Sequence, residues 1–234
     1  MKPTLNFHSF ADADELAEHL AARVADLLRQ AIKARGRATL VVSGGSTPKP
    51  LFRALAHQAL DWGRVTVTLA DERWVDTTAP DSNEGLLRRY LLRDQAGAAK
   101  VVGLKNKAAT AKEGEKECAQ RLAGLPRPFD VVILGMGGDG HTASFFPGAR
   151  RLPEALDMKS GRDCLAISPP EAPHERMTLT LPVLLDSRQI ILHITGPAKK
   201  KVLEQALADG PATAMPIRTI LRQQQTPLSV YWAP

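Results

Sequence analysis

Short apolar runs of strand length alternate along this chain with segments of helical periodicity. This alternation constrains the fold more than any other feature, because it is typical of a mostly parallel β-sheet covered by helices on both faces. The predicted strands are 38–42, 64–70, 129–134, 163–168, 177–181, 189–195 and 228–232, and the predicted helices are 9–34, 48–59, 82–93, 111–123, 198–208 and 212–221. We therefore predict an α/β fold, a three-layer αβα sandwich around a Rossmann-like sheet, in a single domain over residues 1–234.

Local signals set some of the boundaries. Ser9 and Asp12 have the spacing of a capping box, so the first helix is predicted to begin at Ser9, and Gly36 is expected to end it. The segments 96–110 and 150–162 have the weakest periodicity, and we expect both to be surface excursions.

Composition argues against several classes of protein. The net charge is +6, but the basic residues are scattered, and there is no helix-turn-helix, zinc-finger or aromatic-plus-basic pattern, so we expect no nucleic-acid partner. No apolar run is long enough to cross a membrane, and the first 20 residues carry four acidic side chains, so we expect a cytoplasmic protein. Cys118 and Cys164 lie too far apart for a zinc-binding pair and are too few for a disulfide framework.

Ligands of open α/β sheets bind beyond the carboxyl ends of strands, which directs attention to the polar loops that follow the predicted strands. The first such loop combines two glycines with three hydroxyls, in the order Ser43, Gly44, Gly45, Ser46, Thr47, and runs into a helix at Pro48. Backbone N–H groups at a helix start suit a phosphate. The alternative is an ordinary strand-to-helix turn capped by Ser46 or Thr47, and the sequence leaves both readings open.

A second loop begins with Asp71, Glu72 and Arg73 after a strand rich in valine and threonine. The carboxylates could serve as a base, and the planar guanidinium of Arg73 could bind a phosphate. A cluster of surface ion pairs is the alternative explanation.

The third loop, 135–148, contains the glycine spacing of a dinucleotide-binding motif. Pro147 and Gly148 cut the following helix short, and no second strand ends in an acid at the required distance, so we exclude NAD. Within this loop Asp139 and His141 are the candidate chemical groups. We predict a short helix over 142–146 whose positive end keeps His141 neutral, so that it can act as a general base oriented by Asp139. The alternative is a structural histidine that caps this helix.

Two further cationic residues occur beside strand ends. Lys199 stands at the start of a predicted helix, where a cation is unfavourable, and this suggests an anionic partner. A mobile surface lysine is the alternative. Arg176 at the beginning of a predicted strand is a similar candidate.

In order and completeness these motifs resemble those of the 6-phosphogluconolactonases, in the superfamily that includes the glucosamine-6-phosphate deaminases. The matching segments are Ser-Gly-Gly-Ser-Thr-Pro at 43–48, Asp-Glu-Arg at 71–73, Ser-Asn-Glu at 82–84, Gly-Met-Gly-Gly-Asp-Gly-His-Thr-Ala-Ser at 135–144, Arg-Met-Thr-Leu-Thr at 176–180, and Thr-Gly-x-x-Lys at 195–199. The resemblance implies hydrolysis of a phosphorylated sugar lactone in the oxidative pentose phosphate pathway, without metal or cofactor. We expect a monomer or a small homo-oligomer, and the sequence does not decide between them.

The resemblance also implies residue roles. His141 would activate water with support from Asp139, while substrate and phosphate would be bound by Ser43, Gly44, Gly45, Ser46, Thr47, Asp71, Arg73, Arg176 and Lys199. Deaminases carry an Asn-Glu-Pro segment with a catalytic acid where this chain has Phe145 and Phe146, which disfavours that activity. A non-catalytic sugar-phosphate sensor is the other alternative, and it is disfavoured by the presence of Asp139 and His141.

Overall fold

The computed structural model describes residues 5–171 and 173–234. Its centre is a seven-stranded sheet in the order β1-β10-β9-β6-β2-β3-β5, in which every neighbouring pair is parallel. These strands are β1 (Asn6–Ser9), β2 (Ala38–Val42), β3 (Val65–Leu69), β5 (Lys100–Val102), β6 (Val131–Leu134), β9 (Ile190–Thr195) and β10 (Leu228–Ala233). The predicted mostly parallel sheet is confirmed.

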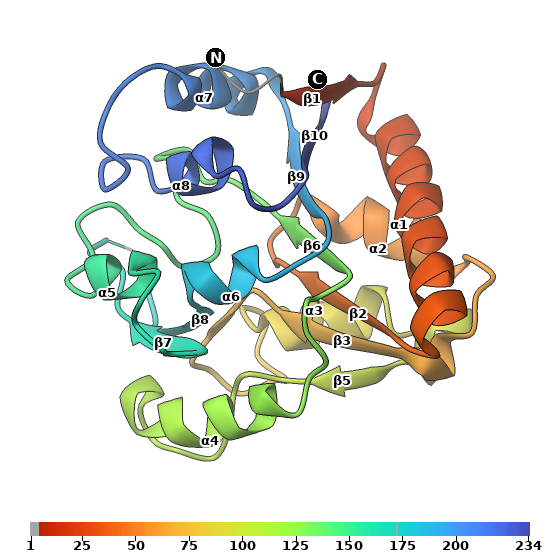
Figure 1. Cartoon of the computed structure of the whole chain (residues 1–234), viewed down its shortest axis with the longest axis horizontal. Coiled ribbons are helices and arrows are strands. Elements are labelled where there is room, and N and C mark those ends of the chain that lie inside the picture. The colour runs from red at the N-terminus through yellow and green to blue at the C-terminus, as the bar shows by residue number, and fades with distance from the viewer. Residues whose placement is uncertain (1–4, 172) are drawn as a thin grey trace.

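Helices cover this sheet on both sides. They are α1 (Ala13–Arg35), α2 (Pro48–Ala56), α3 (Asn83–Tyr90), α4 (Ala111–Ala123), α5 (Leu152–Leu156), α6 (Leu181–Leu185), α7 (Pro197–Leu207) and α8 (Ile217–Arg222), with short 3-10 helices at Trp62–Arg64 and Asp94–Ala98. Figure 1 shows α1 on one side of the strands and α7 and α8 on the other. Every residue of β2 and β6 is buried, as expected for strands covered on both faces. No helix in the described part of the chain is long and apolar enough to cross a membrane.

A small second sheet lies beside the first. It contains β4 (Asp71–Arg73), β8 (Arg176–Leu179) and β7 (Cys164–Ile167), paired antiparallel in the order β4-β8-β7. The strands predicted at 163–168 and 177–181 therefore exist, but they belong to this sheet and not to the parallel one.

Several predicted boundaries are wrong. Ser9 lies in the edge strand β1, and Asp12 is the N-cap of α1, where its Oδ1 accepts hydrogen bonds from the N–H groups of Asp14 at 3.0 Å and Glu15 at 2.8 Å. The predicted excursion 96–110 contributes β5, and the predicted excursion 150–162 contains α5. The last helix begins at Ile217 and not at residue 212. Gly36 ends α1 as predicted, with a φ of 74°.

The sheet changes winding direction between β2 and β6. From β2 the chain continues outward to β3 and β5, whereas from β6 it continues to β9 and β10 on the other side. At such a switch point the loops that follow the two central strands diverge and leave a crevice at their carboxyl ends. The loops after β9, β6, β2 and β3 all begin at this edge.

Candidate active site

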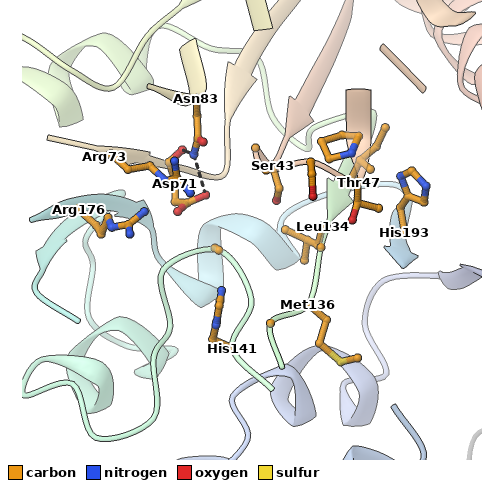
Figure 2. Close-up of a pocket in the computed structure, with 18 of the residues that line it drawn as sticks. Ser43, Thr47, Asp71, Arg73, Asn83, Leu134, Met136, His141, Arg176 and His193 are labelled. Atoms are coloured by element: carbon orange, nitrogen blue, oxygen red, sulfur yellow. Dashed lines mark hydrogen bonds between the residues drawn. The ribbon is translucent and has the colours of Figure 1, made fainter. Parts of the chain in front are cut away.

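A cavity of about 340 Å³ opens at the carboxyl ends of β2 and β6. Its wall contains all but one of the predicted site residues, namely Ser43, Gly44, Gly45, Ser46, Thr47, Asp71, Arg73, His141, Arg176 and Lys199. The exception is Asp139, which lies behind His141 and lines an adjoining hollow. Figure 2 shows Arg73, Asp71 and Arg176 on one side of the cavity, Ser43 and Thr47 across from them, and His141 below and between.

The His141 imidazole is held by a tight turn. Gly137 donates its N–H to the carbonyl of His141 at 2.8 Å, and Gly140 adopts a φ of 78°. Asp139 Oδ1 accepts the backbone N–H of His141 at 3.0 Å and lies 2.6 Å from Nδ1 of its ring. Burial by itself would raise the pKa of Asp139, but the hydrogen bonds from His141 lower it to about 2. The carboxylate is therefore ionised at neutral pH, and Nε2 is the imidazole nitrogen left to act on a ligand.

No helix follows His141, so the predicted helix at 142–146 and its effect on the imidazole are wrong. Thr142 and Phe145 instead form an isolated bridge around a turn in which Ala143 has a φ of 47°. The Thr142 hydroxyl donates to the carbonyl of Gly135 at 2.8 Å and anchors this turn to the end of β6. The structure surrounds His141 with the Asp139 carboxylate and the Phe146 ring, whose centroid lies 4.4 Å from that of the imidazole.

Two arginines face each other across the second sheet. The antiparallel register of β4 and β8 places Arg73 directly opposite Arg176. Their guanidinium groups donate to the backbone carbonyls of Asp81 at 2.5 Å and Pro173 at 3.2 Å. Like charges directly opposite each other on a sheet are destabilising, and burial together with the charge of Arg73 lowers the pKa of Arg176. An anion bound between the two guanidinium groups would replace their mutual repulsion with attraction to the anion.

The loop between β2 and α2 supplies the opposite wall. Gly45 has a φ of 101°, a left-handed conformation that favours glycine. Thr47 is the N-cap of α2, but its side chain makes no capping hydrogen bond. The alternative of a strand-to-helix turn capped by the Thr47 side chain is therefore wrong. Lys199 lies in the first turn of α7, as predicted, and burial lowers its pKa.

Buried polar atoms without a partner concentrate in this cavity. Within the described residues there are four such side-chain atoms, and three of them belong to residues of the cavity wall: Ser43 Oγ, Asn83 Oδ1 and Arg176 Nε. A buried polar group left unpaired costs roughly 1–3 kcal/mol. Their concentration in one place favours a polar ligand that supplies the missing partners.

The family model described as "Glucosamine-6-phosphate isomerases/6-phosphogluconolactonase" matches residues 11–232. The chain belongs to this family.

Individual members resemble it over nearly their full length. A 6-phosphogluconolactonase of Rhizobium meliloti is 48% identical over 98% of this chain and 99% of its own, and one of Pseudomonas putida is 47% identical over 97% and 92%. A crystal structure of a 6-phosphogluconolactonase from Shewanella baltica superposes with a TM-score of 0.97 and 47% identity, over 100% of both chains.

Asn83 also lines the cavity, and Glu72, one of the two carboxylates considered as a base in the sequence, holds Asn83 in place. The Glu72 carboxylate is fully buried and accepts the N–H groups of Asn83 at 2.7 Å and Glu84 at 2.8 Å, so it holds the start of α3. Burial outweighs these hydrogen bonds and raises the pKa of Glu72 to about 6. A surface ion-pair cluster is therefore the wrong description of this loop. The Ser-Asn-Glu motif at 82–84 was the available signal.

His193 and Ser144 were also missed. His193 lies inside β9 and lines the cavity near Thr47 (Figure 2), and burial lowers its pKa to about 4. Ser144 is fully buried, and its hydroxyl donates to Asp71 at 2.6 Å. Ser144 ends the glycine-rich motif at 135–144, which was the available signal, whereas nothing in the local sequence distinguishes His193 from an ordinary core position. In the described ranges, no group of three or more His, Cys, Asp or Glu side chains is arranged to hold a metal ion.

Proposed function

We propose that this chain hydrolyses 6-phospho-D-glucono-1,5-lactone to 6-phospho-D-gluconate in the oxidative pentose phosphate pathway. The observation that carries the proposal is the 2.6 Å contact between Asp139 and His141 at a cavity that also contains the facing cations Arg73 and Arg176. A base and a dianion-binding wall in one cavity are what a phosphorylated lactone requires. The names of relatives that span nearly the whole chain support the same substrate.

The chemistry begins with His141. Its Nε2 takes a proton from water while the water oxygen bonds to the lactone carbonyl carbon, whose π electrons move to the carbonyl oxygen. When that tetrahedral intermediate collapses, the bond to the ring oxygen breaks, and the ring oxygen receives the proton from the imidazolium. Asp139, ionised throughout, stabilises the imidazolium and fixes the imidazole tautomer. A general base of this kind contributes about 10²- to 10⁴-fold.

The cationic wall holds the phosphate. Arg73, Arg176 and Lys199 supply three positive charges, and the loop at 43–47 adds hydroxyl and backbone donors. Binding energy from the phosphate fixes the position of the lactone carbonyl relative to His141, which makes the attack effectively intramolecular. The deaminase alternative is not favoured, because Phe146 occupies the wall next to His141 where that reaction needs an acid.

The test uses lactone generated freshly from glucose 6-phosphate, with decay followed by NMR against the spontaneous rate. Wild-type protein should accelerate decay, and His141→Asn should lose about 10²- to 10⁴-fold in kcat. His57→Asn is the matched control, because His57 is exposed and, within the described part of the chain, its one ion-pair contact is with Asp94 at 3.7 Å. Wild-type protein that does not exceed the spontaneous rate would refute the proposal. Full activity in His141→Asn would refute the assignment of the base alone.

A further inference from the structure

Asp71 is a negatively charged group in a cavity that, on the proposed function, binds a dianion. This residue is only 6% exposed and lies in the cavity wall. Asp71 and Arg73 are two residues apart on β4, so they face the same side of the strand. A carboxylate next to a phosphate site weakens binding of the phosphate. We therefore expect Asp71 to make a favourable contact with another part of the substrate.

Two neighbours hold this carboxylate in place. The Ser144 hydroxyl donates to Oδ2 at 2.6 Å, and the Asn83 amide donates to the backbone carbonyl of Asp71 at 2.9 Å and to Oδ1 at 3.4 Å. Ser144 belongs to the same loop as His141, so Asp71 is tied to the loop that carries the base. An ionised carboxylate can accept about four hydrogen bonds. These two donors leave acceptor capacity on the side that faces the cavity (Figure 2).

The chemistry of the lactone determines what can bind there. Its phosphate oxygens and its carbonyl oxygen are acceptors, so an acceptor-only carboxylate cannot bind them. The ring hydroxyls are the donors that the substrate offers. We propose that Asp71 accepts a hydrogen bond from a ring hydroxyl and thereby determines which phosphorylated lactones are hydrolysed. This inference rests on the proposed function.

Two other roles predict a different pattern of effects. A counter-ion for Arg73 and Arg176, or a second base, would act equally on every phosphorylated lactone. A hydroxyl acceptor acts only on substrates that carry the hydroxyl. Sites built to bind a substrate hydroxyl reject the analogue without it, because the protein group is then left unpaired.

The experiment compares kcat/KM of wild type and Asp71→Asn on the parent lactone and on its 2-deoxy, 3-deoxy and 4-deoxy analogues. On the parent, Asp71→Asn should lose about 10- to 10²-fold, as expected for a hydrogen bond to a charged group. On one analogue the two proteins should agree within about threefold. An equal loss on all four substrates would overturn the proposal. If wild type does not hydrolyse even the parent, the proposed function itself has failed, which is a separate outcome.

A second variant keeps the test independent of folding. Ser144→Ala leaves the Asp71 carboxylate present but removes its 2.6 Å donor. We expect a smaller loss with the same dependence on one hydroxyl, and a uniform loss would again overturn the proposal. Stabilisation by inorganic phosphate, measured as a thermal shift, reports whether each variant keeps the anion site. Asp71→Asn should bind phosphate at least as tightly as wild type, because a negative charge has been removed.

Discussion

Gly137 lies so close to the base that a single methyl group there should disable it. A Cβ built at residue 137 would lie 2.0 Å from His141 Nδ1, 2.2 Å from its Cε1 and 2.5 Å from Asp139 Oδ1. Favourable contacts between heavy atoms require about 3.5 Å, so the imidazole and the carboxylate must both move by roughly 1 Å or more. The backbone does not oppose alanine, since Gly137 is not among the positive-φ glycines.

Misplacement by about 1 Å costs on the order of 10²-fold in rate, and the whole general-base contribution is about 10²- to 10⁴-fold. We therefore expect Gly137→Ala to lower kcat by about 10²-fold or more, equivalent to about 3 kcal/mol in the barrier. KM should change by only a few-fold, because the three atoms nearest to the added methyl group belong to His141 and Asp139 and not to the predicted phosphate-binding residues.

Gly138→Ala is the matched control. It adds the same methyl group one residue later, where a Cβ would meet nothing within 4 Å and the φ is also not positive. This variant should keep kcat within about twofold of wild type. Steady-state lactone hydrolysis of both variants, with circular dichroism to confirm folding, gives the comparison. Equal activity in the two variants would refute the reasoning that steric displacement of His141 and Asp139 is the cause.

Three further predictions concern other parts of the site. Between pH 6.5 and 4 the unfolded chain takes up a proton on His193 that the buried native side chain does not, so the free energy of unfolding decreases as the pH falls. Urea unfolding at pH 7.5 and at pH 5 should therefore show a decrease in the free energy of unfolding that is about 2 kcal/mol smaller in His193→Gln than in wild type. Arg176→Met relieves the repulsion with Arg73, so the Tm of this variant without an anion should equal or exceed that of wild type. Phosphate at 100 times its Kd should raise the Tm of wild type by about 5 to 10 °C, and this rise should largely disappear in the variant. Gly44→Ala would place a Cβ 1.9 Å from Asn83 Oδ1 and should lose activity, whereas Gly135→Ala, with nothing within 4 Å, should retain it.

The sequence predicted the strands whose burial is nearly complete and missed those at the sheet edges. β2 and β6 consist almost entirely of apolar residues, and this pattern is readable without a structure. β1 is mostly exposed and β5 has only three residues, one of them Lys100, so neither has an apolar run to detect. Both owe their conformation to pairing with β10 and β3, which are distant in sequence or separated by a long connection.

The false helix at 142–146 has a similar cause. Its residues are individually compatible with a helix, but the Thr142 hydroxyl bonds to Gly135 and Ala143 is held in a left-handed conformation. The Ser144 N–H also donates to the Thr178 hydroxyl of β8 at 3.4 Å, so these contacts depend on the end of β6 and on β8 and not on local preference. The site loops could be predicted from the sequence, because each follows a predicted strand. The pairing of Arg73 with Arg176 could not be predicted, because it depends on the register of two strands that are far apart in sequence.

The charges around the cavity bear on the last step of the proposed reaction. The cavity that contains Arg73, Arg176 and Lys199 also has two carboxylates near it, Asp71 in its wall and Asp139 behind His141. A lactone with a dianionic phosphate adds its charge at the cationic wall, but hydrolysis creates a new carboxylate next to His141, on the side where Asp139 is already ionised. The imidazole lies between the two carboxylates, but like charges still repel each other across a partly buried site. The arrangement that positions the base should therefore also weaken binding of the product, and 6-phosphogluconate is expected to inhibit with a Ki above the KM of the lactone.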